Sequence, residues 1–93
     1  MKIIVLDGRC MTSKEEAHKY MKEKLELPEY YGENLDALWD VMSSYSECLT
    51  VIIENEKEIY EKLGLYGEKL LEVLHDASYE NENISVYYAT GGQ

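Results

Sequence analysis

The run LTVII at residues 49–53 indicates the fold class of this 93-residue chain. It is continuously apolar and rich in β-branched side chains, which is typical of a strand covered on both faces. Similar runs at residues 3–6 and 84–88 lie on either side of it, and the segments between them carry helical periodicity. The sequence therefore predicts an α/β fold: a small three-stranded parallel sheet packed with about four helices and joined by right-handed crossovers.

Capping residues predict where the first two helices begin and end. Ser13 followed by Glu16 is a capping-box pattern for the first helix. Pro28 holds the residue before it extended, so this helix should end before the tyrosine pair at 30–31. Asn34 is a good N-cap for a second helix, and Gly32 supplies a residue free to take φ > 0 if the turn needs it.

Two further helices are predicted after the central strand. Asn55, with Glu58 three residues later, repeats a cap-like start, and that segment should stop at Gly64. A last helix should run from about residue 68 to residue 79. Its inward-facing positions are Leu70, Leu71, Leu74 and Ala77. The C-terminal residues 91–93 are expected to be frayed.

The chain is strongly acidic: nineteen Asp and Glu against nine Lys and Arg give a formal net charge of −10. Nucleic acid and anionic membrane surfaces both bind proteins through positive charge, so we expect neither as a partner. A basic protein would be attracted, and its encounter accelerated. Because acidity also serves solubility in a small protein, the charge restricts the class of partner without identifying it.

The two cysteines, Cys10 and Cys48, lack metal-ligand or CxxC spacing. The apolar run near the N-terminus is only four residues long, too short for a signal peptide or a membrane span. We therefore expect a cytoplasmic, reducing location with both thiols free, although spacing alone leaves a disulfide between them open.

Two aspartates lie four residues apart on the predicted second helix. Like charges at this spacing repel by roughly 0.2–0.5 kcal/mol. Asp36 lies in the first turn, where the helix dipole favours a negative charge. Asp40 lies one turn further on, where that benefit has largely gone, and no neighbouring residue compensates it. Asp40 is thus the residue that needs a partner from elsewhere.

Aromatic residues gather around these aspartates. They are Tyr30, Tyr31, Trp39 and Tyr45. Tyrosine and tryptophan dominate interface hot spots, which favours a binding surface here, although Trp39 is equally compatible with the core.

A second acidic feature lies on the last helix. Its members are spaced by four: Glu68, Glu72, Asp76 and Glu80. The row contains no lysine at i+4 that would offset its repulsion. A solvated face is the simplest interpretation, and a surface covered by a cationic partner is the alternative.

Catalysis has little support in the sequence. Paired carboxylates serve glycosidases, but that chemistry needs a cleft and a raised pKa, which two aspartates on the outer face of one short helix do not provide. His18 and His75 are each isolated, and we interpret both as surface histidines without a chemical role. We therefore expect no enzyme, no metal and no cofactor, and we keep a small carbohydrate-processing enzyme as a minor alternative.

The stretch LPEYYGENLDALWD at residues 27–40 resembles the signature of the barstar family, intracellular inhibitors of secreted microbial ribonucleases. Chain length and strand order resemble that family from end to end. The resemblance implies one barstar-like domain over residues 1–93, with a three-stranded parallel sheet. It also implies a protein, monomeric when free, that inhibits a basic extracellular-type ribonuclease by plugging its active site with the second helix and the loop before it.

By similarity, Asp40 enters the phosphate-binding pocket of the ribonuclease and mimics the substrate phosphate, while Asp36 meets another basic group. Gly32 allows close approach of the loop backbone. The full partner-binding set that we predict is Tyr30, Tyr31, Gly32, Asn34, Leu35, Asp36, Trp39, Asp40, Ser43, Ser44, Tyr45, Asp76 and Glu80.

Four positions depart from the best-known family member. Tyr45 stands where a tryptophan is expected, Ser44 where a glycine is, and Leu49 where a proline is. Asp76 replaces a glutamate that reaches the enzyme from the last helix. These differences leave the target open, and the alternative is a barstar-like binding module or immunity protein for a different basic toxin or partner protein.

Overall fold

A computed structural model describes residues 1–89, in which three strands form one parallel sheet. In chain order the elements are β1 (Lys2–Asp7), a short 3-10 helix η1 (Gly8–Cys10), α1 (Lys14–Lys24), α2 (Leu35–Ser43), β2 (Leu49–Glu54), α3 (Glu56–Leu63), α4 (Leu65–Glu80) and β3 (Ile84–Tyr88). The central β2 pairs in parallel with both β1 and β3. The predicted α/β class, the three-stranded parallel sheet and the four α-helices are confirmed.

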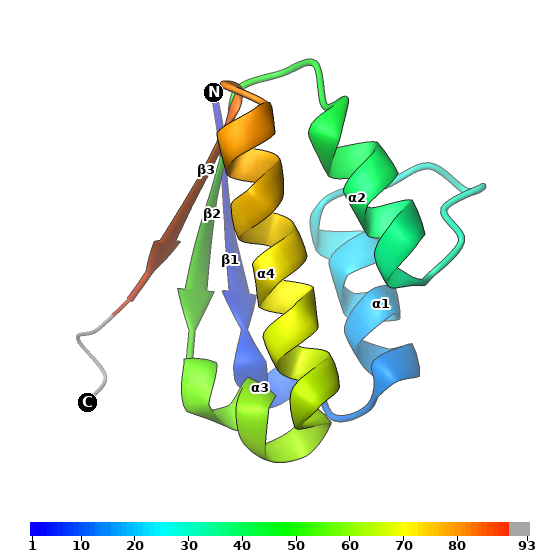
Figure 1. The fold of residues 1–93 in the computed structure, drawn as a ribbon, viewed down its shortest axis with the longest axis vertical. Helices are drawn as coiled ribbons and strands as arrows, with labels where there is room; N and C mark the ends of the chain where they lie inside the picture. The colour runs from blue at the N-terminus through cyan, green and yellow to red at the C-terminus, as the bar shows by residue number, and fades with distance from the viewer. Residues whose placement is uncertain (90–93) are drawn as a thin grey trace.

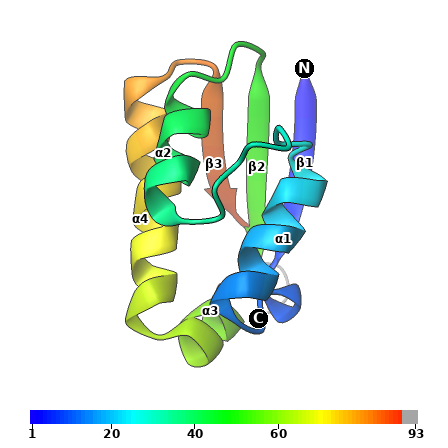
Figure 2. The ribbon, with the colours of Figure 1, turned by 90° about the vertical axis from the view of Figure 1, so that its right-hand side faces the viewer.

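Helices α1, α2 and α4 all lie against the same face of the sheet, while α3 closes one end (Figures 1 and 2). The prediction that the strands are covered on both faces is therefore wrong. Along β2, Leu49, Val51 and Ile53 are buried, whereas the alternate residues Thr50 and Ile52 are only half-buried. On the uncovered face, Ile3 and Tyr87 are each 60% exposed. A β-branched run fits the pleat of a strand whether or not both faces are covered, so it does not report the number of layers.

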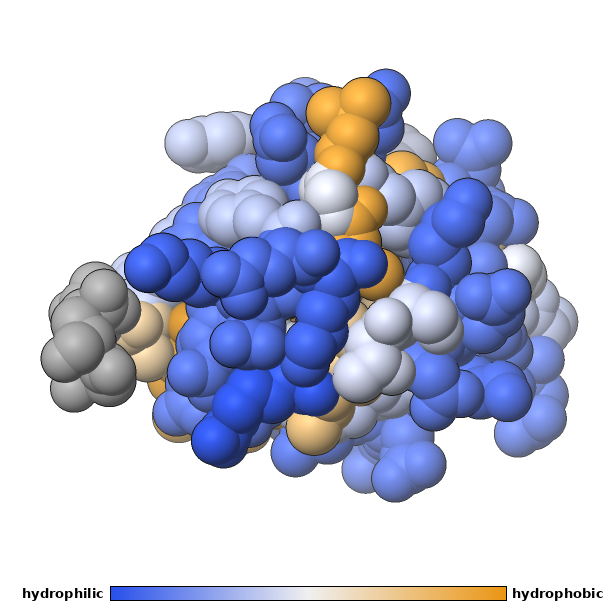
Figure 3. Space-filling model, turned by 90° about the horizontal axis from the view of Figure 1, so that it is seen from below, coloured by the Kyte–Doolittle hydropathy of each residue, from blue (hydrophilic) through white to orange (hydrophobic). Residues whose placement is uncertain are grey.

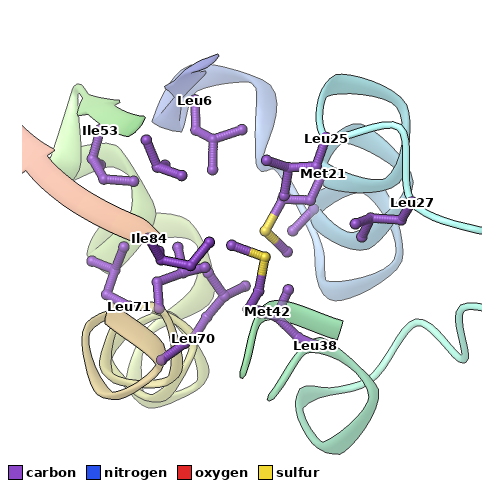
Figure 4. Packing of buried hydrophobic residues seen from close by; sticks show 14 of the residues in the cluster. Leu6, Met21, Leu25, Leu27, Leu38, Met42, Ile53, Leu70, Leu71 and Ile84 are labelled. Carbon is purple, nitrogen blue, oxygen red and sulfur yellow. The ribbon is translucent and has the colours of Figure 1, made fainter. Parts of the chain in front are cut away.

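The hydrophobic core lies between this sheet face and the three helices. Figure 4 shows Met21 of α1 and Met42 of α2 pointing into the same interior space, with Leu70 of α4 and Ile84 of β3 close by. Methionine is unbranched and fills irregular gaps, which suits the place where two helices meet the sheet. All four residues that were predicted to face inward from the last helix are buried.

The helix starts confirm two of the three predicted caps. The Ser13 side chain accepts a hydrogen bond from the Glu16 amide (3.1 Å), and the Asn34 Oδ1 accepts one from the Ala37 amide (2.8 Å). Helix α1 ends at Lys24, before Pro28, as predicted. Gly32, however, does not take a positive φ: that conformation falls on Glu33, with φ of 53°.

The third cap differs from its prediction. Asn55 occupies the N-cap position of α3 but its side chain caps nothing, and its backbone is left-handed (φ 55°). An N-cap residue normally has an extended backbone, from which its side-chain oxygen reaches the helix amides. The Nδ2 of Asn55 donates to Asp7 Oδ1 at 2.8 Å. Helix α3 ends before Gly64 as predicted, and α4 begins at Leu65, three residues earlier than expected.

Residues 91–93, expected to be frayed, lie outside the described residues. Across residues 1–89, no helix is both long enough and apolar enough to cross a membrane. Cys10 and Cys48 are both exposed and free, as predicted.

Candidate partner-binding surface

The two aspartates of α2 are exposed and have no partner within the described part of the chain. Neither Asp36 nor Asp40 takes part in the four ion pairs formed among residues 1–89, and neither carboxylate receives a hydrogen bond there. Lys22, at the end of α1, pairs with Glu29 at 3.6 Å. The prediction that Asp40 is exposed and has no compensating neighbour agrees with this geometry, as far as residues 1–89 are concerned.

Asp40 borders a pocket of about 330 Å³ between α2 and the loop before it. The lining residues are Glu26, Leu27, Pro28, Tyr30, Asp40, Val41, Ser44 and Tyr45. Tyr30 is 85% exposed, whereas Tyr45 is half-buried. Carboxylates combined with aromatic walls suit a cation such as a guanidinium or an imidazolium, which binds both charge and ring faces.

Hydrogen bonds at both ends hold α2 in place. The Asn34 cap fixes its start, and the Ser44 hydroxyl donates to the Asp40 carbonyl at 2.7 Å near its end. The buried Asn81 side chain, from the end of α4, donates to the carbonyls of Met42 (3.0 Å) and Tyr45 (2.9 Å). These bonds satisfy carbonyls that a helix end leaves open, so the backbone that carries Asp40 is rigid.

The comparisons with known proteins agree with this geometry. A family model described as "Barstar (barnase inhibitor)" matches residues 1–90. The chain belongs to the barstar family. A protein of Bacillus subtilis (strain 168) named "Putative ribonuclease inhibitor YrdF" is 40% identical over 81 residues, which cover 86% of this chain and 89% of that protein.

Tyr31, one of the predicted contact residues, is buried in the structure. It is only 5% exposed, and its hydroxyl lies 2.6 Å from Nδ1 of His18. Burial raises the pKa of the Tyr31 hydroxyl well above its ordinary value. Its side chain belongs to the core, while the adjacent Tyr30 points outward.

His18 also differs from its prediction as a surface residue. It is 1% exposed, and its Nε2 lies 2.6 Å from the Tyr66 hydroxyl. Burial lowers the pKa of His18, which favours the neutral ring, while the charge of Glu33 acts weakly in the opposite direction. This contact could not be predicted from local pattern, because the two tyrosines lie 13 and 48 residues away along the chain.

The remaining predicted site residues are accessible to different degrees. Gly32, Asn34, Ser44, Asp76 and Glu80 are exposed, while Leu35, Trp39 and Ser43 are half-buried. Trp39 is only partly buried and packs against the core. It therefore combines the two roles that the sequence left open, a core residue and a residue of a binding surface.

Helix α4 carries an aromatic residue that the sequence analysis missed. Tyr79 is 85% exposed and lies three residues after Asp76 and one before Glu80, on the solvent side of the helix. All four members of the acidic row are exposed, and none takes part in an ion pair among residues 1–89. The periodicity could have indicated Tyr79, because it falls off the inward stripe formed by Leu70, Leu74 and Ala77. His75, by contrast, is half-buried with its Nε2 2.7 Å from the Tyr88 hydroxyl.

A different acidic residue lies at the opposite end of the molecule, at the C-terminal end of β1. Asp7 accepts hydrogen bonds from the Arg9 guanidinium (2.9 Å), the Arg9 amide (2.9 Å) and Asn55. The side-chain hydrogen bonds from Arg9 lower the pKa of Asp7 to about 2. Figure 3 views this end, where hydrophilic side chains cover most of the surface around a narrow apolar strip. Asp7 is thus paired within its own chain, whereas the Asp36 and Asp40 carboxylates have no ion-pair partner among residues 1–89.

Proposed function

We propose that this protein inhibits a ribonuclease by inserting α2 and the loop before it into the active site of the enzyme. The observation that carries the proposal is Asp40: an exposed carboxylate, without a partner in residues 1–89, beside a pocket walled by Tyr30 and Tyr45. Family membership and the name of the Bacillus subtilis relative support this role.

The mechanism follows from the chemistry of the target. A ribonuclease must hold the phosphodiester of RNA with cationic groups, and a carboxylate offers the same charge and two acceptor oxygens. Asp40 takes the place of that phosphate and blocks the substrate without any chemical step. Because α2 is fixed at both ends, the carboxylate is presented without a large loss of conformational entropy on binding.

The charge of the whole chain brings the partner to the site. A net charge of −10 and the exposed acidic row on α4 attract a basic enzyme of the secreted microbial type. Exposed charges act over about 10 Å at 0.1 M salt, so this contribution changes the association rate more than the lifetime of the complex.

Location is part of the same proposal. An inhibitor of this kind acts in the cytoplasm of the cell that makes the ribonuclease, as an immunity protein, and as a monomer when free. The two free, exposed cysteines are compatible with a reducing compartment.

The test is a titration of ribonuclease activity with the purified protein, using a panel of basic microbial ribonucleases. We expect activity to fall linearly to zero at one inhibitor per enzyme for at least one member. A residual activity that stays constant at saturation would contradict active-site occlusion, because a blocked site leaves none.

A second candidate target is a basic toxin of another enzymatic class. Ser44 and Tyr45, two positions that depart from the best-known family member, both line the pocket beside Asp40, so the part of the site nearest the partner has changed. A pull-down from the source cell with the parent protein and the Asp40→Ala variant distinguishes the two. Recovery of a non-ribonuclease partner by the parent alone would favour this second candidate.

A further inference from the structure

We propose that His18 is a positioning residue for the partner-binding loop, which it fixes from inside the core through Tyr31. This inference rests on the proposed function, since the loop at residues 27–34 carries Tyr30 and Gly32 to the partner. His18, Tyr31 and Tyr66 together form a unit that we call the His18 clamp.

The clamp joins three segments that are distant along the chain. His18 lies on α1, Tyr31 in the loop before α2, and Tyr66 in the first turn of α4. Both ring nitrogens of the histidine are 2.6 Å from a tyrosine hydroxyl, and the histidine is 1% exposed. A buried polar group without its partner costs about 1–3 kcal/mol, so the loop cannot move Tyr31 away from His18 freely.

Counting donors assigns the direction of each bond. A neutral imidazole donates from one nitrogen and accepts at the other. Within residues 1–89 the buried Tyr31 hydroxyl has no hydrogen-bond partner other than His18, so its proton would be left unpaired if it accepted from the ring, whereas Tyr66 is only half-buried. Tyr31 therefore donates to Nδ1, and Nε2–H donates to Tyr66.

The loop itself requires such an anchor. Glu33 has a left-handed backbone (φ 53°), which costs a residue with a Cβ roughly 1–2 kcal/mol. Strained conformations of this kind persist only where the surroundings determine them. The loop backbone has a hydrogen bond from the Tyr31 amide to the Pro28 carbonyl (2.9 Å) and one from Asn34 Nδ2 to the Gly32 carbonyl (3.2 Å), both internal to the loop. The His18–Tyr31 bond ties this strained segment to the rest of the molecule.

The loop residues on either side of Tyr31 depend on this bond. Tyr30 is 85% exposed, and a Cβ added at Gly32 would lie 3.3 Å from Asn34 Nδ2. The positions of both residues depend on the buried Tyr31 between them. A loop that is already in its bound shape avoids the ordering cost on association. The clamp therefore acts on partner affinity although His18 touches no partner.

The experiment compares Tyr31→Phe with the matched control Tyr66→Phe. Each variant removes one hydroxyl from the same histidine, but only the first releases the loop. We expect amide hydrogen exchange of residues 30–34 in the free protein to be about tenfold faster in Tyr31→Phe, relative to β2 amides, and within about twofold of the parent in Tyr66→Phe. The dissociation constant for the inhibited ribonuclease should follow the same pattern.

A double variant separates positioning from stability. His18→Leu combined with Tyr31→Phe leaves no buried nitrogen unsatisfied, so its melting temperature should recover toward the parent while loop exchange and affinity do not. Equal loop exchange in Tyr31→Phe and Tyr66→Phe would overturn the proposal. If the parent inhibits no ribonuclease, the proposed function fails, and the exchange measurement still decides whether the clamp fixes the loop.

Discussion

Asp7 and Asp40 are the same residue type in two contrasting settings at two ends of the molecule. At the end of β1, Asp7 is surrounded by donors of its own chain, from Arg9 and Asn55, and its pKa is lowered to about 2. On α2, Asp40 is exposed, without an ion pair or a hydrogen bond to its carboxylate in residues 1–89. The difference teaches that a satisfied carboxylate contributes to folding, whereas one held rigidly without a partner is available to another molecule.

The largest effect should come from removing the carboxylate that has no partner. Asp40→Ala is expected to weaken the ribonuclease complex by about 3–5 kcal/mol, because it leaves the cations of the enzyme buried and unpaired. The free energy of unfolding should change by less than about 0.5 kcal/mol. Inhibition titrations and urea unfolding measure the two quantities. Glu72→Ala on α4 is the control. If Asp40→Ala inhibits as well as this control, the contrast between Asp7 and Asp40 has no consequence for inhibition.

The converse change should act on folding alone. Asp7→Ala removes the acceptor of Arg9 and Asn55 and should lower the free energy of unfolding by about 2 kcal/mol, as for other hydrogen bonds to charged groups. The left-handed Asn55 also loses the side-chain bond that holds it. Affinity for the ribonuclease should stay within about twofold of the parent. If Asp7→Ala is as stable as the parent yet inhibits poorly, Asp7 acts in binding and not in folding.

Acid should affect the two ends differently. The pKa of Asp7 is 3.8 when unpaired and about 2 in the folded protein, so the unfolded chain takes up the proton first as pH falls. The contribution of Asp7 is therefore present above pH 3.8 and is lost as pH falls toward 2, and it amounts to about 2 kcal/mol. In urea unfolding from pH 5 to pH 2, the stability gap between the parent and Asp7→Asn should close by this amount. A stability gap that is constant over this range would show that the hydrogen bonds to the Asp7 carboxylate do not stabilise the folded protein.

The smallest effect should follow from giving Asp40 a partner within its own chain. Ser44 lies one turn after Asp40 and lines the same pocket, so a lysine there can pair with the carboxylate. Ser44→Lys is expected to weaken inhibition by about tenfold and to change stability by less than about 0.5 kcal/mol, which is the usual value of an exposed i,i+4 pair. Ser44→Gln controls for size, and equal losses in both variants would indicate a steric effect rather than competition for the charge.

The sequence predicted those parts of the fold that depend on local pattern. The three strands, the Ser13 and Asn34 caps and the inward stripe of α4 all follow from spacings of a few residues, and all are confirmed. The exposed position of Asp40 followed from the same periodicity.

Most of the errors share a physical cause: they depend on a partner that is far away in sequence. Asn55 bonds Asp7 across 48 residues, and His18 bonds tyrosines 13 and 48 residues away. Tyr30 and Tyr31 are neighbours of identical type, and only Tyr31 packs into the core and contacts His18. The number of covered sheet faces likewise depends on where the helices pack, which no strand sequence specifies.

The central claim is that Asp40 occupies the phosphate site of a ribonuclease, and competition with inorganic phosphate tests it most directly. The apparent dissociation constant is measured for the parent and for Asp40→Ala as phosphate replaces chloride at fixed ionic strength. We predict that phosphate weakens the parent complex in proportion to its concentration and hardly affects the Asp40→Ala complex, which leaves that site open. Equal weakening of both complexes, or of neither, would contradict the account.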